Sequence, residues 1–343
     1  MAVEPHPKTA ERRSPQGPSG DAERDVTLEA RGVRRAYGDL VALDDLTFSA
    51  RAGEVLGLLG RNGAGKTTAI RVLTTILEPS AGTFAVGGVP HTRPAEIRRR
   101  VGVLPESAGY PESQTPLEFL RYHARLFGHS QASAAAAAAA LLADVGLADR
   151  ASSAIAHLSR GMRQRLGIAR ALIGRPAVVF FDEPTLGLDP AGQAQVLRIV
   201  ERIAAEGGVT VVLSTHVLGE VEEVCSRVLI LRSGRLVADG PVAEVARRAA
   251  APRTGRLRVP AGLRDRALTV LAGTPGVGGA RAADGRPDWL TVTLDEDPGA
   301  DGASPVRVDG AVRALAEAGI PLLAFELEGA RLSDAFLVMT EGG

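Results

Sequence analysis

The chain has 343 residues, and its 40 basic and 40 acidic side chains give a formal net charge of zero at pH 7. This length predicts about two domains that can each bury a core, and the balanced charge gives no reason to expect a nucleic-acid partner. The single cysteine, Cys225, excludes a disulfide framework, and no apolar run reaches the ~18 residues of a membrane-spanning helix. We therefore expect a soluble protein of the reducing cytoplasm.

The N-terminal segment combines proline, glycine and charged residues with almost no large apolar side chain. Such a segment cannot offset the entropy lost on ordering, so we predict a disordered tail over residues 1–24. Order is expected from Asp25, where apolar and polar residues begin to alternate as in a strand, and residues 40–50 indicate a second strand. Tyr37 lies between the two strands. It either packs, as strand aromatics commonly do, or stacks on a base.

A glycine-rich segment follows the apolar run 55–59 and precedes a helix-like pattern over 69–73. Its residues match the phosphate-binding pattern G-x-x-x-x-G-K-[ST]; they are Gly60, Arg61, Asn62, Gly63, Ala64, Gly65, Lys66, Thr67 and Thr68. The glycines let successive backbone N–H groups point at a phosphate, and the helix N-terminus adds partial positive charge. Lys66 can reach the β- and γ-phosphates, and the Thr67 hydroxyl can bind Mg²⁺. The segment predicts a nucleotide-binding protein.

Two short strands are expected after this helix, and the second of them ends at Glu106. Residues 113–158 then indicate mostly helices, including an alanine run that has the highest helix propensity. Ser159 suits the N-cap position of the amphipathic helix that follows, which would be a purely structural role. We place a helical subdomain over about 107–168.

A continuous apolar run over 177–181 is typical of a strand buried on both faces, and Asp182 and Glu183 close it. A second buried strand covers 209–214, and His216 follows it. Ligands of open α/β sheets lie at the carboxyl ends of the strands, so the phosphate loop, both acids and the histidine are expected at one edge.

At that edge, Asp182 can complete the Mg²⁺ shell that Thr67 begins, and Glu183 can take a proton from an attacking water. Two adjacent acids alone would more often be an exposed loop, but the phosphate loop reverses that preference because its metal needs the ligand. A lone His216 at a strand end stays ambiguous between a structural and a phosphate-facing role.

These motifs resemble the ATP-binding cassette family, the ATPase subunits of ABC transporters, over about Val26 to Val245. The matching segments stand in the family's order: 60–68 is similar to Walker A, Glu106 stands at the Q-loop position, Leu158-Ser159-Arg160-Gly161-Met162 is similar to the signature motif, 178–183 to Walker B, Leu186-Gly187-Leu188-Asp189 to the D-loop, His216 to the switch histidine, and Tyr37 to the adenine-stacking aromatic. The signature motif is the most discriminating of these, because other phosphate-loop proteins lack it.

Three positions depart from the family pattern. Arg160 stands for the first of two signature glycines, Met162 for a common glutamine, and Glu106 for the Q-loop glutamine. The Ser159 hydroxyl and the backbone N–H groups still suit a phosphate, and Glu106 keeps oxygens for Mg²⁺ and water. The Leu-Pro-Glu form at 104–106 is similar to bacterial exporter ATPases of the antibiotic-resistance, daunorubicin-resistance-like type.

The resemblance implies an α/β fold for residues 25–246, a P-loop NTPase cassette with a RecA-like core, an antiparallel β subdomain and a helical subdomain. We expect a linker over 247–254 and a small α+β domain over 255–343, whose β-α-β-β-α-β pattern suggests a ferredoxin-like fold. This domain carries no titratable cluster, so packing or dimerisation is its expected role. Residues 332–337 resemble the tail of drug-resistance exporter ATPases.

The resemblance also implies how the site works. ATP with Mg²⁺ is sandwiched between Walker A of one copy and the signature motif of a second, so Ser159, Gly161 and Asp189 act across a head-to-tail homodimer. Glu183 is then the general base, His216 contacts the γ-phosphate, and Glu106 senses it and helps to hold the metal. Residues of about 106–130 form the groove that receives separate transmembrane permease subunits.

We therefore expect the ATPase subunit of an ABC transporter, peripheral at the cytoplasmic face of the plasma membrane, that exports drug-like or other amphipathic compounds. The alternative is a soluble cassette ATPase that acts on ribosomes or nucleic acid. Such relatives usually carry two cassettes or long coiled coils, whereas this sequence has one copy of each motif and no heptad run.

Overall fold

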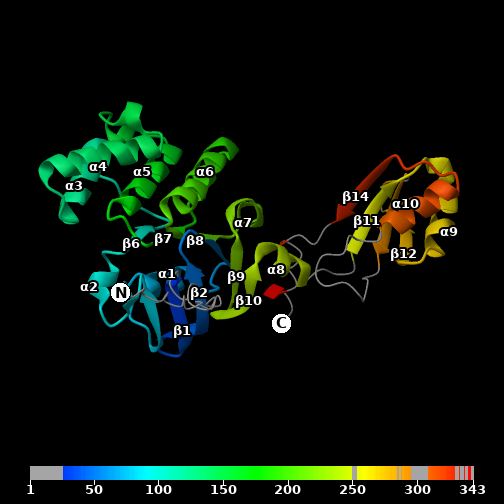
Figure 1. The fold of residues 1–343 in the computed structure, drawn as a ribbon, viewed down its shortest axis with the longest axis horizontal. Helices are drawn as coiled ribbons and strands as arrows, with labels where there is room; N and C mark the ends of the chain where they lie inside the picture. Colours follow the sequence, from blue (N-terminus) through cyan, green and yellow to red (C-terminus); the bar gives the residue numbers. More distant parts are fainter. Residues whose placement is uncertain are drawn as a thin grey trace, which may run out of the picture.

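The computed structural model describes residues 26–248, 253–283, 286, 288–294, 308–328, 332, 336, 339 and 340. The predicted disordered tail over 1–24 lies outside the described residues. The described strands form three sheets, and the two that flank the glycine-rich loop lie together at one end of Figure 1.

The central sheet contains six strands with these bounds: β3 Val55–Leu59, β6 Val101–Leu104, β7 Val178–Asp182, β8 Thr210–Thr215, β9 Arg227–Arg232 and β10 Arg235–Pro241. Their order is β10-β9-β3-β8-β7-β6, and all neighbours are parallel except β10, which turns back along β9. Every residue of β3, β7 and β8 is buried, as continuous apolar runs in a parallel sheet require. Because these three strands are parallel, they end at the same edge.

The central sheet is covered on both faces. The elements that pack on it are the strands β1 Val26–Tyr37, β2 Leu40–Arg51, β4 Ala81–Val86 and β5 Val89–Pro90 and the helices α1 Lys66–Leu73, α5 Arg160–Leu172, α6 Pro190–Gly207, α7 Leu218–Val224 and α8 Val242–Arg248. Successive strand residues point to opposite faces. Phe180 accordingly packs with α1 and the antiparallel sheet β2-β1-β4-β5, whereas Phe181 packs with α5, α6 and α7.

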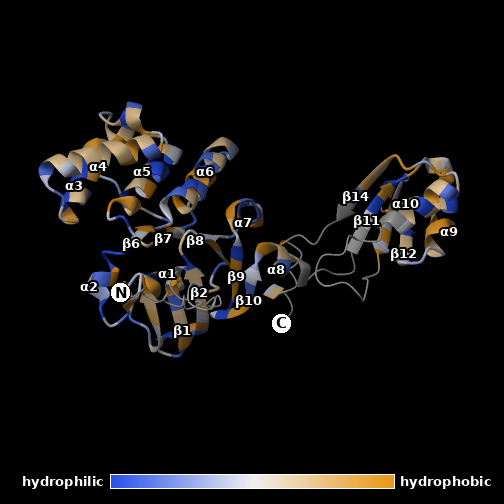
Figure 2. Cartoon of the chain, viewed as in Figure 1, coloured by the Kyte–Doolittle hydropathy of each residue, from blue (hydrophilic) through white to orange (hydrophobic). Residues whose placement is uncertain are grey.

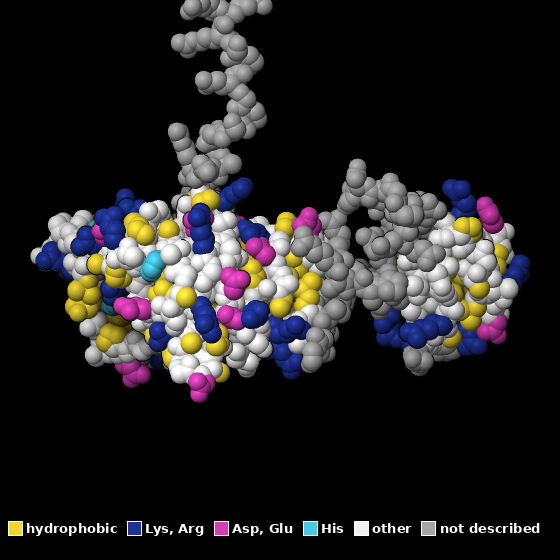
Figure 3. Space-filling view, turned by 90° about the horizontal axis from the view of Figure 1, so that it is seen from below, with side chains coloured by type: hydrophobic (Ala, Val, Ile, Leu, Met, Phe, Trp, Pro, Cys, Tyr) yellow, Lys and Arg dark blue, Asp and Glu magenta, His cyan; other side chains and the backbone are white. Residues whose placement is uncertain are grey.

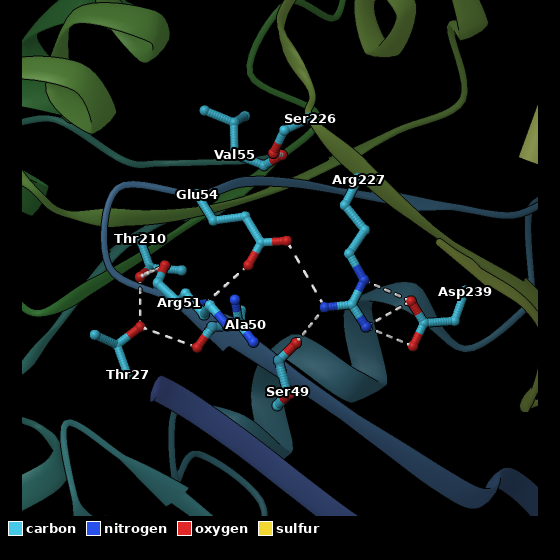
Figure 4. A network of polar contacts seen from close by, with 10 residues as sticks. All are labelled: Thr27, Ser49, Ala50, Arg51, Glu54, Val55, Thr210, Ser226, Arg227 and Asp239. Carbon is cyan, nitrogen blue, oxygen red and sulfur yellow. Dashed lines mark hydrogen bonds and ion pairs between the residues drawn. The ribbon is translucent and has the colours of Figure 1, made fainter. Parts of the chain in front are cut away.

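A network of polar contacts joins the antiparallel sheet to the central sheet (Figure 4). Arg227 on β9 donates two hydrogen bonds to the Asp239 carboxylate, at 2.6 and 2.7 Å, and one to the Ser49 carbonyl at 2.8 Å. Its guanidinium also lies 3.7 Å from Glu54, whose other oxygen accepts the Arg51 backbone N–H. The bidentate pair fixes Arg227 at the seam between the two sheets.

We predict that Arg227→Met lowers the free energy of unfolding by about 1.5–3 kcal/mol, because it removes hydrogen bonds from a charged group, leaves Asp239 unpaired and takes the nearby cation from Glu54. Urea unfolding measures this. The control is Arg198→Met, which changes an exposed arginine of α6 and should shift stability by less than about 0.5 kcal/mol. Equal losses in the two variants would show that the network carries no special stability.

Two helices fill most of the region 113–158, as predicted: α3 Pro116–Leu126 and α4 Gln131–Asp144. Thr115 and Glu118 form a capping box at the start of α3. The alanine run lies in α4, which Figure 2 colours toward the hydrophobic end over most of its length. A short helix, α2 Pro94–Ile97, was not expected from the sequence. Among the described residues no helix combines the length and apolarity that a bilayer span needs.

The third sheet forms a separate core. Its elements are β11 Arg253–Arg258, α9 Arg264–Ala272, β12 Val277–Ala282, β13 Trp289–Leu294, α10 Val308–Glu317 and β14 Ala324–Glu328. They follow the predicted β-α-β-β-α-β order, and the strands lie in the order β12-β13-β11-β14 with antiparallel neighbours. The core residues include Leu257, Leu271, Val292 and Leu315.

The predicted linker over 247–254 is too wide. Helix α8 continues to Arg248, and β11 begins at Arg253, where the backbone pairs with Leu294 on β13. Residues 249–252 lie outside the described part of the chain. Pairing with β13 determines where β11 begins. The sequence alone does not show which residue of another strand will lie opposite Arg253.

The described residues near the C-terminus pack on the core of the central sheet and not on the third sheet. Leu332 is fully buried there, and its backbone N–H donates to Glu222 of α7 at 2.7 Å. Phe336 and Met339 also pack against this core. The predicted C-terminal domain over 255–343 includes these residues, but Leu332, Phe336 and Met339 pack on the core that contains α7.

Candidate active site

The glycine-rich loop connects β3 to α1, at the carboxyl edge of the central sheet. Gly65 is the residue before α1 and has a φ of 109°, a conformation that side chains rarely adopt. A Cβ added there would lie 2.7 Å from the Ala42 carbonyl oxygen, so the loop can approach β2 only with glycine at this position. The backbone N–H groups at the start of α1 face the loop, which favours a bound phosphate.

Lys66 is almost fully buried, and its ammonium is held by the loop itself. It donates to the Gly60 carbonyl at 2.7 Å and lies 3.8 Å from the Glu183 carboxylate. A buried ammonium costs free energy unless it has partners. These two contacts keep the charge at the place where the sequence predicts a phosphate.

Thr67 and Asp182 bring two oxygen ligands together. The Thr67 hydroxyl donates to Asp182 Oδ2 at 3.0 Å, and Asp182 ends the buried strand β7. The described residues contain no group of three histidines, cysteines or acids that could hold a metal without help. A hydroxyl with one carboxylate suits Mg²⁺, which usually takes one or two carboxylates and completes its shell with phosphate oxygens and water. These residues therefore fit the predicted ion.

Glu183 adopts an unusual backbone conformation directly after β7. Its φ is 52°, which is uncommon for a residue other than glycine, and its N–H donates to the Ser214 carbonyl on β8 at 2.9 Å. The side chain is 11% exposed and lies 2.8 Å from His216 Nδ1. The turn thus aims the carboxylate along the edge of the sheet, between Lys66 and His216.

These residues surround one cavity of about 720 Å³. Its lining is Tyr37, Leu40, Ala42, Arg61, Asn62, Gly63, Ala64, Gly65, Lys66, Thr67, Thr68, Glu106, Asp182, Glu183, Leu186 and His216. The structure therefore brings together most of the predicted site residues, and Gly60 lies beneath them as the acceptor of Lys66. Tyr37 is 43% exposed, with the Arg35 guanidinium 4.6 Å from its ring centre. No sequence signal marks Leu40 or Ala42, whereas Leu186 begins the segment that resembles the D-loop.

Ser159, Gly161 and Asp189 line a different cavity, of about 460 Å³. Ser159 is the N-cap of α5 and accepts the Met162 N–H at 3.3 Å, and Asp189 caps α6 in the same way. Both therefore have the structural role that capping residues fill. Within one chain the two halves of the predicted site do not meet.

A parallel sheet with a phosphate loop after one strand, an acid pair after another and a histidine after a third defines a P-loop nucleoside triphosphatase. A family profile described as "ABC transporter" matches residues 43–186. The chain is 37% identical over 322 residues to the daunorubicin resistance ATP-binding protein DrrA3 of Streptomyces coeruleorubidus. The aligned residues cover 92% of this chain and 96% of the relative. The chain belongs to the ABC transporter family, as an ATP-binding subunit that hydrolyses ATP.

Two further relatives agree with this assignment. The Nod factor export ATP-binding protein I of Burkholderia orbicola (strain AU 1054) is 38% identical over 62% of this chain and 70% of its own length. A solved structure titled "Structure of ATP binding subunit of ABC transporter" is 34% identical with a TM-score of 0.58, over 65% of this chain and 92% of that one. The relatives named for drug resistance and Nod factor export are of the exporter type.

Proposed function

We propose that the chain is the ATPase subunit of an exporter of drug-like or other amphipathic compounds. Two copies would hydrolyse ATP head to tail at the cytoplasmic face of the plasma membrane, and so drive separate permease subunits. The observation that carries this proposal is the division of the motif residues between two cavities of one chain. We call the cavity around Lys66 the first cavity and the cavity around Ser159 the second cavity. A second copy that presents its Ser159 and Gly161 to the first cavity would complete the site in both subunits.

Different residues of the first cavity would bind the adenine, the phosphates and the metal ion. Tyr37 would stack on the adenine, and Lys66 and the loop N–H groups would hold the phosphates. Thr67 and Asp182, with Glu106, would hold Mg²⁺, which offsets phosphate charge when it is bound.

Hydrolysis would then need one proton transfer. A water oxygen attacks the γ-phosphorus while the bond to the β–γ bridging oxygen breaks, and Glu183 accepts the proton of that water. His216 lies 2.8 Å from Glu183 and would hold the carboxylate and contact the γ-phosphate. Orientation and charge stabilisation supply most of the catalysis in such transfers.

Exposed side chains in the helical region support a permease-binding groove over about 106–130. Large apolar side chains are exposed on and after α3, namely Tyr122, Leu126 and Phe127, and clustered exposed apolar groups commonly mark an interface. For the third sheet, the β-α-β-β-α-β order and the strand order β12-β13-β11-β14 support a ferredoxin-like domain that packs or dimerises. The accessory domain and the helical region would then act on different partners.

Membrane flotation tests the proposal against a ribosomal or nucleic-acid role. We expect the full chain to float with membranes when it is co-expressed with its cognate permease subunits, and to lose that association when they are omitted. Basic and acidic side chains are interspersed over the ATPase part of the face in Figure 3, which offers no basic surface there for nucleic acid. Sedimentation with ribosomes, unaffected by the permease, would contradict the proposal.

A further inference from the structure

The guanidinium of Arg160 lies against Gly187, in the segment 186–189. A Cβ placed on Gly187 would be 2.7 Å from Arg160 Cζ and 2.8 and 2.9 Å from its two terminal nitrogens. Three nearly equal distances put that Cβ position over the face of the planar group, so the guanidinium is stacked on Gly187. The φ of 70° at Gly187 also favours glycine. A side chain at 187 would therefore meet Arg160 in addition to the backbone strain.

No ion pair or hydrogen bond between described residues accounts for an arginine at this position. Arg160 is exposed and is the first residue of α5, where a positive charge is unfavourable because it meets the positive end of the helix dipole. Its guanidinium is exposed to solvent on the side away from Gly187. Within the described part of the chain, its close approach to Gly187 is therefore the contact that places the guanidinium.

The segment under Arg160 leads directly to the predicted general base. The Leu186 N–H donates to the Glu183 carbonyl at 3.2 Å, and the Leu188 N–H donates to the Thr185 carbonyl at 3.1 Å, which makes two successive turns. Leu186 lines the first cavity, whereas Gly187 and Leu188 line the second. One short loop therefore runs from Glu183 to the face that carries Ser159.

We propose that Arg160 is a positioning residue that holds the loop 183–189, and through it aligns Glu183 when the second cavity receives nucleotide from another copy. The inference rests on the proposed function, because only hydrolysis by two copies uses both cavities. Arg160 touches no reacting atom in this role. It makes the second cavity and the catalytic edge move as one unit, by its contact with the Gly187 backbone.

The first test is the split between binding and turnover in Arg160→Gly. We expect kcat to fall about tenfold, since a small misplacement of a catalytic group is costly, while binding of a fluorescent ATP analogue to the isolated chain stays unchanged. Arg160→Lys, which keeps the charge but lacks the planar face, should recover only part of the rate. Arg150→Gly, an exposed arginine outside both cavities, serves as the control. A parental kcat in Arg160→Gly, or full recovery by lysine, would overturn the proposal.

The second test is a double-mutant cycle with Gly187→Ala, whose Cβ displaces the guanidinium. If the contact matters, Gly187→Ala lowers kcat much less in the Arg160→Gly background than in the parent. Equal losses of kcat in the two backgrounds would overturn the proposal. Hydrogen exchange of amides 185–189 in the isolated chain should also be faster in Arg160→Gly, and unchanged exchange would contradict the contact. That readout needs no second copy, so it separates a failure of this inference from a failure of the proposed dimer.

Discussion

Replacement of Glu183 by glutamine is expected to lower kcat by about 10²–10⁴-fold, the range that a general base contributes. Glutamine has the shape of glutamate but cannot accept the proton of the attacking water. ATP binding should persist because Lys66, Thr67 and Asp182 are untouched. ATP would then remain between two copies, and a stable dimer should accumulate. Steady-state ATPase rates and size-exclusion chromatography with and without MgATP measure the two effects.

Glu201→Gln provides the matched control, because it removes an exposed carboxylate of α6 that is remote from the cavity lining. It should leave both the rate and the oligomeric state as in the parent. Hydrolysis at the parental rate in Glu183→Gln would show that Glu183 is not the base. A slow variant that stays monomeric with ATP would instead count against the head-to-tail dimer.

The site was predictable from the sequence wherever chemistry depends on local order along the chain. The phosphate loop is contiguous, and the acids at 182 and 183 stand directly after an apolar run that is typical of a buried strand. Parallel strands end at one edge, so topology places His216 beside Glu183 without any knowledge of side chains. The 2.8 Å contact between them is a consequence of that edge.

The remaining features depend on which residues meet across the fold. Leu40 and Ala42 line the cavity although nothing in their type or spacing indicates it. Arg160 was predicted only as a departure from a motif, and its stacking on Gly187 requires the α5 and α6 termini to be in place. Leu332 lies far along the chain from α7, and its burial there could not be inferred from periodicity. Long-range packing of this kind is invisible in a local pattern.

Replacement of Lys66 is the second change with a large expected effect. Lysine occurs at only two positions of the sequence, 8 and 66, although the chain has 40 basic residues. Its slender stem and compact ammonium fit a buried position beside the Gly60 carbonyl, where the broad guanidinium fork of arginine does not. We expect Lys66→Met to lower kcat/KM by at least ~100-fold, because the phosphates lose a preorganised cation in the ground and transition states.

We expect Lys66→Arg to lower kcat/KM almost as much as Lys66→Met, although arginine retains the positive charge. Methionine matches the length of the stem and removes the need to desolvate an ammonium, so unfolding of Lys66→Met without nucleotide should be no easier than in the parent. Titration with a fluorescent ATP analogue measures nucleotide binding, and urea unfolding measures the stability of the chain without nucleotide. If arginine restored the rate, charge alone would suffice and the argument from the Gly60 contact would be wrong. If methionine destabilised the apo chain strongly, Lys66 would act first as a structural residue that pairs with Glu183 at 3.8 Å.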